Sequence, residues 1–513
     1  MPKKNDLPTP VTYSQKFYAK AAGMDVDLPE AITPEQKYLK AIAEGGGVSP
    51  DDTYTKAQTD ALLGGKVDKE TGKVLSTNDF TDAYKAAVDG AAPQSTTYTK
   101  SEVDTSQAGQ NESITSIQAS VDVLRLMMDA TVYGFRIDKN NSDPETRVEY
   151  LYDAIGMTPA RMNYTTGVFD YGSWENAWFV VGNRPVALKF DGTVDYELDP
   201  DDYTKKADGT ASDVSNSEYE GNFMATMPTV WIRRWEDADY QYYAFSDKQI
   251  NSSFKAYAHD AGDGFINDTI YLPMFEGAII DGKLRSIAGV IPRSGTSGSE
   301  EQTAAEACGT GWQIWDWAKH ELISDLLTLI SRSTDSQTAF GKGDTNTYDE
   351  TDTTTYGMLT TGTSGAGRFY GTNDETHHVK VFHFEDFWGN RSDTLLGLNV
   401  LNKQFSYKMV RPYALSPDSS ISSGFDVPDS GYQIQNHIGE FGNLPKTTGG
   451  SAATYICDLY TGLTTNDNRL AFFGGSCNSR SESGSRCLSQ RIVSYSSYKL
   501  VGASPCYNAP HSS

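Results

Sequence analysis

The stretch Leu470–Ser476 reads LAFFGGS, and the polar run CNSRSESGSRCLSQRIVSYSSY follows it over Cys477–Tyr498. A hydrophobic strand that ends in Gly474 and Gly475 predicts a sharp turn, because glycine has no Cβ to clash there. The run after the turn has too few apolar residues to fill a core, so we expect it to lie exposed. Its Ser, Asn, Arg and Tyr residues are typical of binding loops, where they make adaptable hydrogen bonds and rigid aromatic contacts.

Two further stretches matter, one earlier in the chain and one later. Phe387–Asp393 reads FWGNRSD, and Leu500–Pro505 begins with LVGAS. Gly389 is expected to permit a second sharp turn. Leu470–Ser476 and Leu500–Pro505 are expected to be a buried frame, which leaves Cys477–Tyr498 as the contact surface. The motif residues of the frame are Trp388, Gly389, Asn390, Gly474, Gly475, Ser476 and Gly502.

In this order and rough spacing, the three stretches resemble markers of the C-type-lectin-like fold in its formylglycine-generating-enzyme branch. Those markers are a WGN-containing turn, a hydrophobic strand that ends in GGSW, and a closing strand that reads GFR or GAR. The variable proteins of diversity-generating retroelements, many of them phage receptor-binding proteins, use the same layout. The resemblance implies that residues 131–513 form a C-type-lectin-like mixed β domain with insertions, with a variable region at about residues 470–507.

The chain departs from the family pattern at three places. Cys477 stands where the family has Trp, Ser504 stands where Arg closes the last motif, and Arg391–Ser392 replaces the aromatic half of the first turn. The copper-binding cysteine pair of the catalytic enzymes has no match among the five cysteines. The resemblance therefore implies a ligand-presenting role without the oxidase activity.

The polar run supplies the predicted ligand contacts. They are Asn478, Ser479, Arg480, Ser481, Ser483, Ser485, Arg486, Ser489, Arg491, Tyr495, Ser496 and Tyr498. Adenine-directed mutagenesis of Asn codons reaches Asn, Ser, Arg, Cys and Tyr, but it does not reach Lys, Glu, Gln, Met or Trp. Between Cys477 and Tyr498, only Glu482 and Gln490 belong to the unreachable set. This composition agrees with targeted diversification, and an ordinary Ser-rich loop would give a similar result.

The N-terminal part has a degenerate repeat and one heptad pattern. Thr53–Leu63 and Thr97–Thr105 share TYTK followed by Asp, and together with LSTNDFTDAYKAAVDG over Leu75–Gly90 they resemble phage tail-fibre shafts. Apolar residues at alternating spacings of 3 and 4 predict a coiled-coil seam, and Ile at both seam positions favours a trimer. The seam consists of Ile114, Ile117, Val121, Leu124 and Met128, extended backward through Gln110, Gln107 and Val103. The open alternative is an amphipathic helix on a globular core.

These patterns predict an α+β chain in which an N-terminal helical, coiled-coil fibre segment precedes the lectin-like domain. Residues 1–50 are a predicted virion attachment module, residues 51–130 a trimeric shaft, and residues 131–513 a receptor-binding domain. The implied protein is a phage tail-fibre adhesin, made in the host cytoplasm and located at the fibre tip of the virion. Its expected partners are a host cell-surface protein or glycan, a tail or baseplate protein at residues 1–50, and two copies of itself.

Charge and composition exclude several function classes. The net charge of −25 argues against a nucleic-acid binder, which needs clustered Lys and Arg, and against docking on anionic lipid. Met1–Tyr13 has no apolar core after its basic start, so we expect no secretory leader. The five cysteines are sparse and contain no CxxC pair, which argues against a disulfide scaffold or a zinc site.

No pattern in the sequence indicates catalysis. His377, His378 and His383 would converge on a metal only if a sharp bend interrupted the strand predicted over Val379–Phe384. Glu385–Asp386 and Asp237 with Asp239 could form a glycosidase pair, but solvated surface charge is the favoured interpretation of these carboxylates. We expect no enzymatic activity and no cofactor, while the Asp- and Asn-rich loops permit structural calcium.

Two alternatives to the fibre adhesin stay open. A tail-associated polysaccharide hydrolase would need an acidic pair in a cleft within residues 131–380, and a bacterial surface adhesin would share the same domain.

Among local elements, apolar spacing predicts a helix over Trp315–Ile330 that packs on a sheet, and Trp178–Val181 is interpreted as a strand.

Overall fold

The computed structural model describes residues 104–105, 107–108, 129–408, 410–416, 421–462, 468–492 and 497–511. The chain divides into two compact units, Met1–Gln107 and Ala108–Ser513. The predicted attachment module over residues 1–50 lies outside the described residues, and the predicted shaft is described only at residues 104–105, 107–108 and 129–130. All heptad positions except Gln107 also lie outside them, namely Val103, Gln110, Ile114, Ile117, Val121, Leu124 and Met128.

The described residues are mostly β-structure, so the predicted α+β fold class is wrong. They contain 38% strand and 12% helix, with four α-helices and no long N-terminal helix of the coiled-coil kind. The predicted coiled-coil segment followed by a C-type-lectin-like mixed β domain is replaced by a mostly β domain with one sheet curled into a half-barrel. The physical reason is that β-branched and aromatic runs bounded by Gly, Asn and Asp favour short strands and turns over helices.

The helices in the described ranges are short. Their bounds are α6 (Trp178–Val181), α7 (Gly298–Glu306), α8 (Trp317–Ser331) and α9 (Ser336–Phe340), with single 3₁₀ turns η2 (Tyr257–His259) and η3 (Arg480–Glu482). The helix predicted over Trp315–Ile330 is confirmed as α8, which begins where the Asp316 side chain accepts a hydrogen bond from the Lys319 amide at 2.9 Å. Among the described residues, no helix has the length and apolar character needed to cross a membrane.

Two antiparallel sheets contain most strands before residue 320. The four-stranded sheet has the order β2 (Val148–Tyr152), β1 (Val132–Asp138), β10 (Tyr240–Ser246) and β9 (Trp231–Glu236). The seven-stranded sheet has the order β14 (Trp312–Ile314), β26 (Pro505–Tyr507), β11 (Thr269–Pro273), β8 (Gly221–Pro228), β5 (Pro185–Lys189), β6 (Val194–Asp199) and β7 (Asp202–Lys206). The C-terminal strand β26 therefore lies inside a sheet that is otherwise built from residues 185–314.

The nine-stranded sheet is mixed and contains the predicted recognition segment. Its order is β19 (Ile421–Asp426), β18 (Gln404–Tyr407), β17 (Ser392–Leu401), β23 (Arg469–Gly474), β24 (Gly484–Ile492), β22 (Leu459–Gly462), β20 (Gly431–Gly439) and β21 (Gly442–Thr448), with β25 (Val501–Gly502) beside β17. β24 pairs antiparallel with β23 and parallel with β22. The polar run is thus partly a central strand, not a free loop.

Three two-stranded hairpins complete the fold, and two sequence interpretations fail near them. The hairpins are β3 (Arg161–Asn163) with β4 (Val168–Asp170), β12 (Ala278–Ile280) with β13 (Lys283–Arg285), and β15 (Lys380–Val381) with β16 (Phe384–Glu385). The predicted strand over Val379–Phe384 is bent, because Phe382 and His383 have φ values of 51° and 64°. Trp178–Val181 is helix α6 instead of a strand, since a four-residue apolar run carries no periodicity that distinguishes the two.

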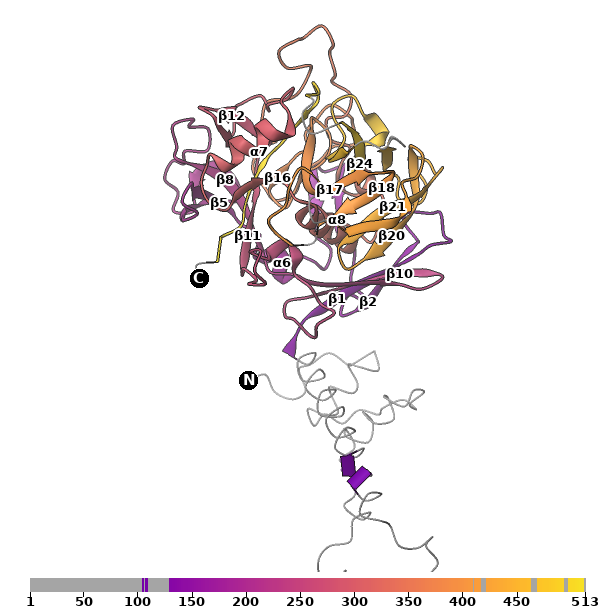
Figure 1. Cartoon of the computed structure of the whole chain (residues 1–513). Coiled ribbons are helices and arrows are strands. Elements are labelled where there is room, and N and C mark those ends of the chain that lie inside the picture. Colours follow the sequence, from indigo (N-terminus) through magenta and orange to yellow (C-terminus); the bar gives the residue numbers. More distant parts are fainter. Residues whose placement is uncertain are drawn as a thin grey trace, which may run out of the picture. The chain divides into compact units, whose positions relative to one another are not determined.

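Helix α8 is the centre of the hydrophobic core. It contacts β17, β21 and β24 of the nine-stranded sheet (Figure 1), and it also contacts the 3₁₀ turn η2. Leu326 and Leu329 belong to one buried cluster that also contains Phe245 of the four-stranded sheet and Phe473 and Leu488 of the nine-stranded sheet. Every α8 residue except Ala318 is buried, so the helix has no solvent-facing side.

The predicted frame is confirmed as buried. Residues 470–477 and 500–507 are all buried, and so are Trp388 and Asn390. Gly389 and Gly474 adopt φ values of 86° and 89°, and an added Cβ at either would press on a backbone oxygen at 2.7 and 2.9 Å. Both sharp turns therefore depend on glycine, as the sequence predicted.

Two of the departures from the family pattern contact each other. The Arg391 guanidinium donates to Ser504 Oγ at 2.9 Å, and Ser504 Oγ in turn donates to Asp393 at 2.8 Å. Arg391 also donates to the carbonyl oxygens of Gly277 and Arg293 at 2.8 and 2.7 Å. Arg391 therefore links the first turn to the segment around Ser504 through hydrogen bonds.

Candidate functional site

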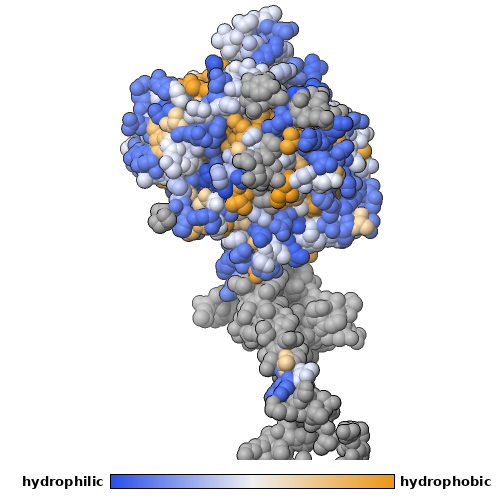
Figure 2. Space-filling model, viewed as in Figure 1, coloured by the Kyte–Doolittle hydropathy of each residue, from blue (hydrophilic) through white to orange (hydrophobic). Residues whose placement is uncertain are grey.

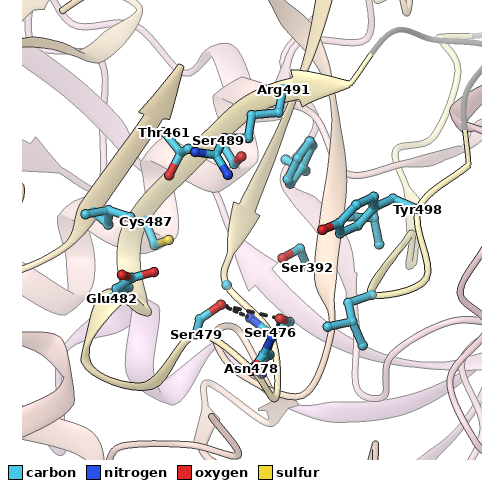
Figure 3. Close-up of a pocket in the computed structure, with 15 residues that line it drawn as sticks. Ser392, Thr461, Ser476, Asn478, Ser479, Glu482, Cys487, Ser489, Arg491 and Tyr498 are labelled. Carbon is cyan, nitrogen blue, oxygen red and sulfur yellow. Dashed lines mark hydrogen bonds between the residues drawn. The ribbon is translucent and has the colours of Figure 1, made fainter. Parts of the chain in front are cut away.

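The candidate site is a pocket at the surface of the nine-stranded sheet. It has a volume of about 210 Å³ and lies between the ends of β22, β23 and β24, the turn after β23, and the segment that precedes β25 (Figure 3). The protein face in Figure 2 is mostly hydrophilic and has small, separate hydrophobic patches. Because the apolar surface on that face is broken up, a concave polar pocket is a better candidate than a broad apolar docking patch.

Main-chain hydrogen bonds between the frame stretches hold the pocket in shape. The Gly389 amide donates to the Gly474 carbonyl at 3.3 Å, and the Cys477 amide donates to the Asn390 carbonyl at 2.9 Å. On the other wall, the Ser392 amide donates to the Leu500 carbonyl at 3.1 Å. The pocket walls are therefore fixed by backbone bonds, which do not depend on the side chains that line the pocket.

Several hydroxyl and amide groups in the lining have no partner. Ser392, Thr461, Asn478 and Ser489 line the pocket, and their side chains make no hydrogen bond to any residue in the described ranges. Polar groups at a protein surface that lack internal partners bond to water or to a ligand. The lining therefore offers donors and acceptors that a ligand can use without breaking internal bonds.

Charged and aromatic groups surround these polar groups. Figure 3 places Arg491 and Asn478 at opposite ends of the pocket, and Glu482 and Tyr498 on opposite sides. Arg491 and Glu482 are exposed, and neither side chain forms an ion pair within the described part of the chain. The Tyr498 ring is 55% exposed. A cation, a carboxylate and an aromatic ring thus face one small cavity.

The thiols near the pocket are not nucleophiles at neutral pH. Burial raises the pKa of the Cys477 thiol to about 12, and burial likewise raises the pKa of Cys487, which lines the pocket, well above its ordinary value. Both thiols consequently stay protonated near pH 7. The pocket offers hydrogen bonding, charge and aromatic contact.

The predicted contact residues fall into three groups. Five of them line the pocket, namely Asn478, Ser479, Ser489, Arg491 and Tyr498. Arg480 and Ser481 are exposed beside it on η3, where the Ser481 hydroxyl lies 3.1 Å from the Tyr432 hydroxyl. Ser483, Ser485 and Arg486 lie inside the protein, while Tyr495 and Ser496 lie outside the described residues.

The expectation that the whole run lies exposed is therefore wrong for Ser483, Ser485 and Arg486. Ser483 and Ser485 are 0% and 5% exposed. The Ser485 amide donates to Ser336 Oγ at 3.0 Å, and the Ser485 carbonyl accepts a hydrogen bond from Ser324 at 2.8 Å. Ser485 therefore joins β24 to α8 and α9, which is a packing role that a Ser-rich composition does not reveal.

Arg486 belongs to a buried ionic network beneath the pocket. Its guanidinium pairs with Glu321 at 3.2 Å and with Asp325, both on α8, and Arg234 of β9 reaches Asp325 at 2.7 Å. Burial opposes the ionised form of Glu321, but the charges of Arg486, His320 and Arg234 prevail and lower its pKa to about 2. Arg486 thus connects the pocket strand to α8.

Strand alternation explains which side chains reach the pocket. Cys487, Ser489 and Arg491 line it, whereas Leu488 lies in the core cluster with α8. Successive side chains of a strand point to opposite faces, so every second residue of β24 faces the ligand. The same rule turns Arg486 toward α8. The alternation could have been found in the sequence only if the run had been recognised as a strand.

Several pocket residues were missed by the sequence interpretation. Ser392 and Thr461 reach the pocket from β17 and β22, and Glu482 reaches it from η3. Thr461 pairs with Ser489 in the parallel ladder between β22 and β24. No local sequence pattern predicts this pairing, because the two segments are distant in the chain. Glu482 lies within the polar run, but it was set apart because adenine-directed mutagenesis cannot produce it.

The three clustered histidines do not converge on one site. His378 Nδ1 lies 2.6 Å from Asp386 and 3.9 Å from Glu385, while His383 bonds to the Tyr203 hydroxyl at 2.6 Å and His377 is exposed. The ligand atoms of His378, Glu385 and Asp386 all lie within 4.8 Å of one another. This is the set that the bend between β15 and β16 brings together.

Protein donors already occupy the atoms that a metal ion would use in this set. Glu385 accepts from the Gly362 amide at 2.7 Å, and Asp386 accepts from the Val379 amide at 3.1 Å. Burial disfavours the charged form of His378, but the charges of Asp386 and Glu385 outweigh burial and raise its pKa to about 10. The arrangement is that of an imidazolium between two carboxylates.

The acidic pairs proposed as glycosidase groups have structural roles in this fold. Glu385 and Asp386 are buried around His378. Asp237 lies at the exposed turn between β9 and β10 and accepts from the amides of Asp239 and Tyr240 at 2.9 and 2.8 Å.

No family model matches this chain, and no curated protein is significantly similar to it.

Proposed function

We propose that this protein is a phage tail-fibre receptor-binding protein that recognises a host cell-surface ligand through the pocket beside β24. One observation carries the proposal. Five residues that the sequence marks as ligand contacts line a single pocket, and its free hydroxyl and amide groups face outward. The fixed backbone walls and exchangeable side chains suit a recognition surface that must change specificity.

The location on a tail fibre and in the virion rests on the sequence. The TYTK repeats support a shaft that attaches through residues 1–50 to a tail or baseplate protein. A trimer would present three pockets, and simultaneous binding raises avidity by about 10² to 10⁴ over one site. Targeted diversification of the pocket strand belongs to the same proposal. A near-copy of its coding region, differing only at adenines, should lie in the neighbouring DNA beside a reverse transcriptase gene.

Alanine variants of the full-length protein test the binding proposal. Arg491→Ala and Tyr498→Ala should each reduce adsorption to host cells at least tenfold, while the thermal midpoint stays within a few degrees of that of the native chain. Arg136→Ala on β1 is the matched control, because that half-buried arginine lies outside the pocket lining and contacts Glu149 and the Tyr240 ring at the surface. Full adsorption by both pocket variants would contradict the proposal, and so would release of reducing ends from host polysaccharide.

The native mass of the full-length protein tests the trimer. Sedimentation equilibrium gives this mass directly, and a trimer should sediment with three times the mass of one chain. A native chain that sediments as a monomer would remove the avidity argument.

A further inference from the structure

The size of the pocket limits the ligand group that it can enclose. Drug-sized molecules occupy cavities of roughly 300–1,000 Å³. The present pocket, at about 210 Å³, suits something smaller, such as one sugar ring of a longer chain. An open mouth at the protein surface lets the rest of a polymer continue outside.

The lining favours a polyhydroxylated ring. Ser392, Thr461, Asn478 and Ser489 offer side-chain hydroxyl or amide groups without internal partners, which both donate and accept hydrogen bonds. The apolar part of the lining includes Phe472, and the exposed Tyr498 ring stands at one side. A pyranose combines these requirements, because its hydroxyl groups lie around the edge and its C–H groups form an apolar face that packs on an aromatic ring.

The charges favour an acidic ring with one orientation. Arg491 is an exposed guanidinium without a carboxylate partner in the described ranges, and its planar donors match a carboxylate through two parallel hydrogen bonds. Glu482 lies across the pocket from Tyr498, away from the end that Arg491 occupies (Figure 3). Its carboxylate repels an anionic group at that side and accepts hydrogen bonds from sugar hydroxyls.

Building on the function proposed above, we propose that the pocket binds one carboxylate-bearing pyranose, a uronic-acid residue of a host surface polysaccharide. The sugar carboxylate lies at Arg491 and the ring packs on Tyr498. Its hydroxyl groups bond to Thr461, Ser489 and Asn478. The charge contact gives discrimination against the neutral sugar, since the two ligands differ only in the group that meets the guanidinium.

The test compares matched sugars on the full-length protein. Glucuronate and galacturonate, free and as short oligomers, should bind at least tenfold more tightly than glucose and galactose by isothermal titration calorimetry. Arg491→Met should abolish this preference but keep weak binding of both classes, because hydroxyl contacts and Tyr498 remain. Tyr498→Ala should weaken acidic and neutral sugars alike. Arg136→Met, at an arginine on β1 outside the pocket lining, is the matched control and should leave the preference unchanged.

The outcomes separate this inference from the proposed function. Equal affinity for acidic and neutral sugars, or a preference that survives in Arg491→Met, overturns the acidic-sugar assignment. If no sugar binds while the pocket variants still lose host adsorption, the inference is wrong and the receptor-binding function stands. If uronates bind as expected but the pocket variants adsorb normally, the sugar site is real and the proposed function is wrong.

Discussion

Arg486 and Arg491 lie five positions apart on β24, so their side chains leave opposite faces of the strand. Arg491 reaches the pocket, and Arg486 reaches two carboxylates of α8. Composition treats the two arginines as equivalent, and the predicted contact set included both. Their surroundings place one at the surface of the pocket and the other in a buried ionic network.

Arg486→Ala should destabilise the fold strongly. Removing the guanidinium leaves buried Glu321 without an arginine partner and leaves Asp325 with Arg234 alone, and breaking a buried pair costs about 3–5 kcal/mol in comparable cases. Arg491→Ala should change the unfolding free energy by less than about 0.5 kcal/mol, because that side chain is exposed. Urea denaturation followed by circular dichroism measures both, and equal costs for the two variants would disprove the division of roles.

Glu301 makes stability depend on pH. Burial raises the pKa of this α7 carboxyl from 4.5 to about 7, against hydrogen bonds from Thr296 and Thr394. Between pH 4.5 and pH 7 the unfolded chain loses this proton while the folded chain keeps it, so stability falls as pH rises through that window. Glu301→Gln removes the effect. Its unfolding free energy relative to the native chain should rise by about 3 kcal/mol from pH 4.5 to pH 7.5.

The matched control for this prediction is Glu306→Gln, at the exposed end of the same helix. Its difference from the native chain should be small and equal at both pH values. A flat profile for Glu301→Gln would refute the pH dependence assigned to Glu301.

At the scale of elements, the turn between β23 and β24 shows how much the sequence could predict. The glycine pair, the buried strand β23 before it and helix α8 followed from local chemistry and apolar spacing. The strand character of β24 did not follow, because its polar residues are buried only through pairing with β22 and β23 and contact with α8. Pairing with distant segments produces no periodic pattern in the amino-acid sequence of the strand itself.

The α+β fold class failed for a related reason. A heptad is a local pattern and indicates a helix strongly, whereas the many short strands after residue 131 depend on pairing across long separations. The same limit applies to Trp178–Val181, whose helical turn is set by the chain reversals on either side of it. Local residue patterns therefore described turns and buried stretches better than they described the sheet order.

Gly475→Ala tests the turn as an element. Gly475 has a φ of 80°, and an added Cβ would clash with Ser483 Oγ and approach Ser479 Cβ to 3.1 Å. Left-handed backbone alone costs a non-glycine residue about 1–2 kcal/mol, and the clash adds to it. We expect a lower unfolding free energy and weaker ligand binding, since Ser479 lines the pocket.

Gly209→Ala is the matched control for that variant. Gly209 has a φ of 85°, and nothing lies within 4 Å of an added Cβ. This substitution should therefore have the backbone cost alone and leave ligand binding unchanged. If both variants are equally destabilised, or if Gly475→Ala binds ligand normally, the turn does not position the pocket.

At the scale of the whole domain, one core connects two sheets through α8. Leu326 is 0% exposed and lies in the cluster shared by the four-stranded and nine-stranded sheets. Leu326→Ala should cost about 2–5 kcal/mol and lower the thermal midpoint. Val181→Ala on α6 is the control, because Val181 is 55% exposed and should change stability by less than about 0.5 kcal/mol.

This core also predicts cooperative unfolding. Tryptophan fluorescence and far-ultraviolet circular dichroism should give coincident transitions for the domain, in the native chain and in Leu326→Ala alike. Two separate transitions, of which the substitution shifts only one, would show that the sheets unfold independently and that α8 does not join them.

The position of β26 has a consequence for how the protein is made. Tyr507 pairs with both Trp312 and Tyr271, so β11 and β14 keep open edges until this late segment arrives. Open strand edges recruit strands from other chains, and pairing across such separations is slow. During synthesis the emerging polypeptide must therefore stay unpaired for a long time, and we expect prematurely terminated chains to aggregate. Only fully translated chains would then give a folded domain.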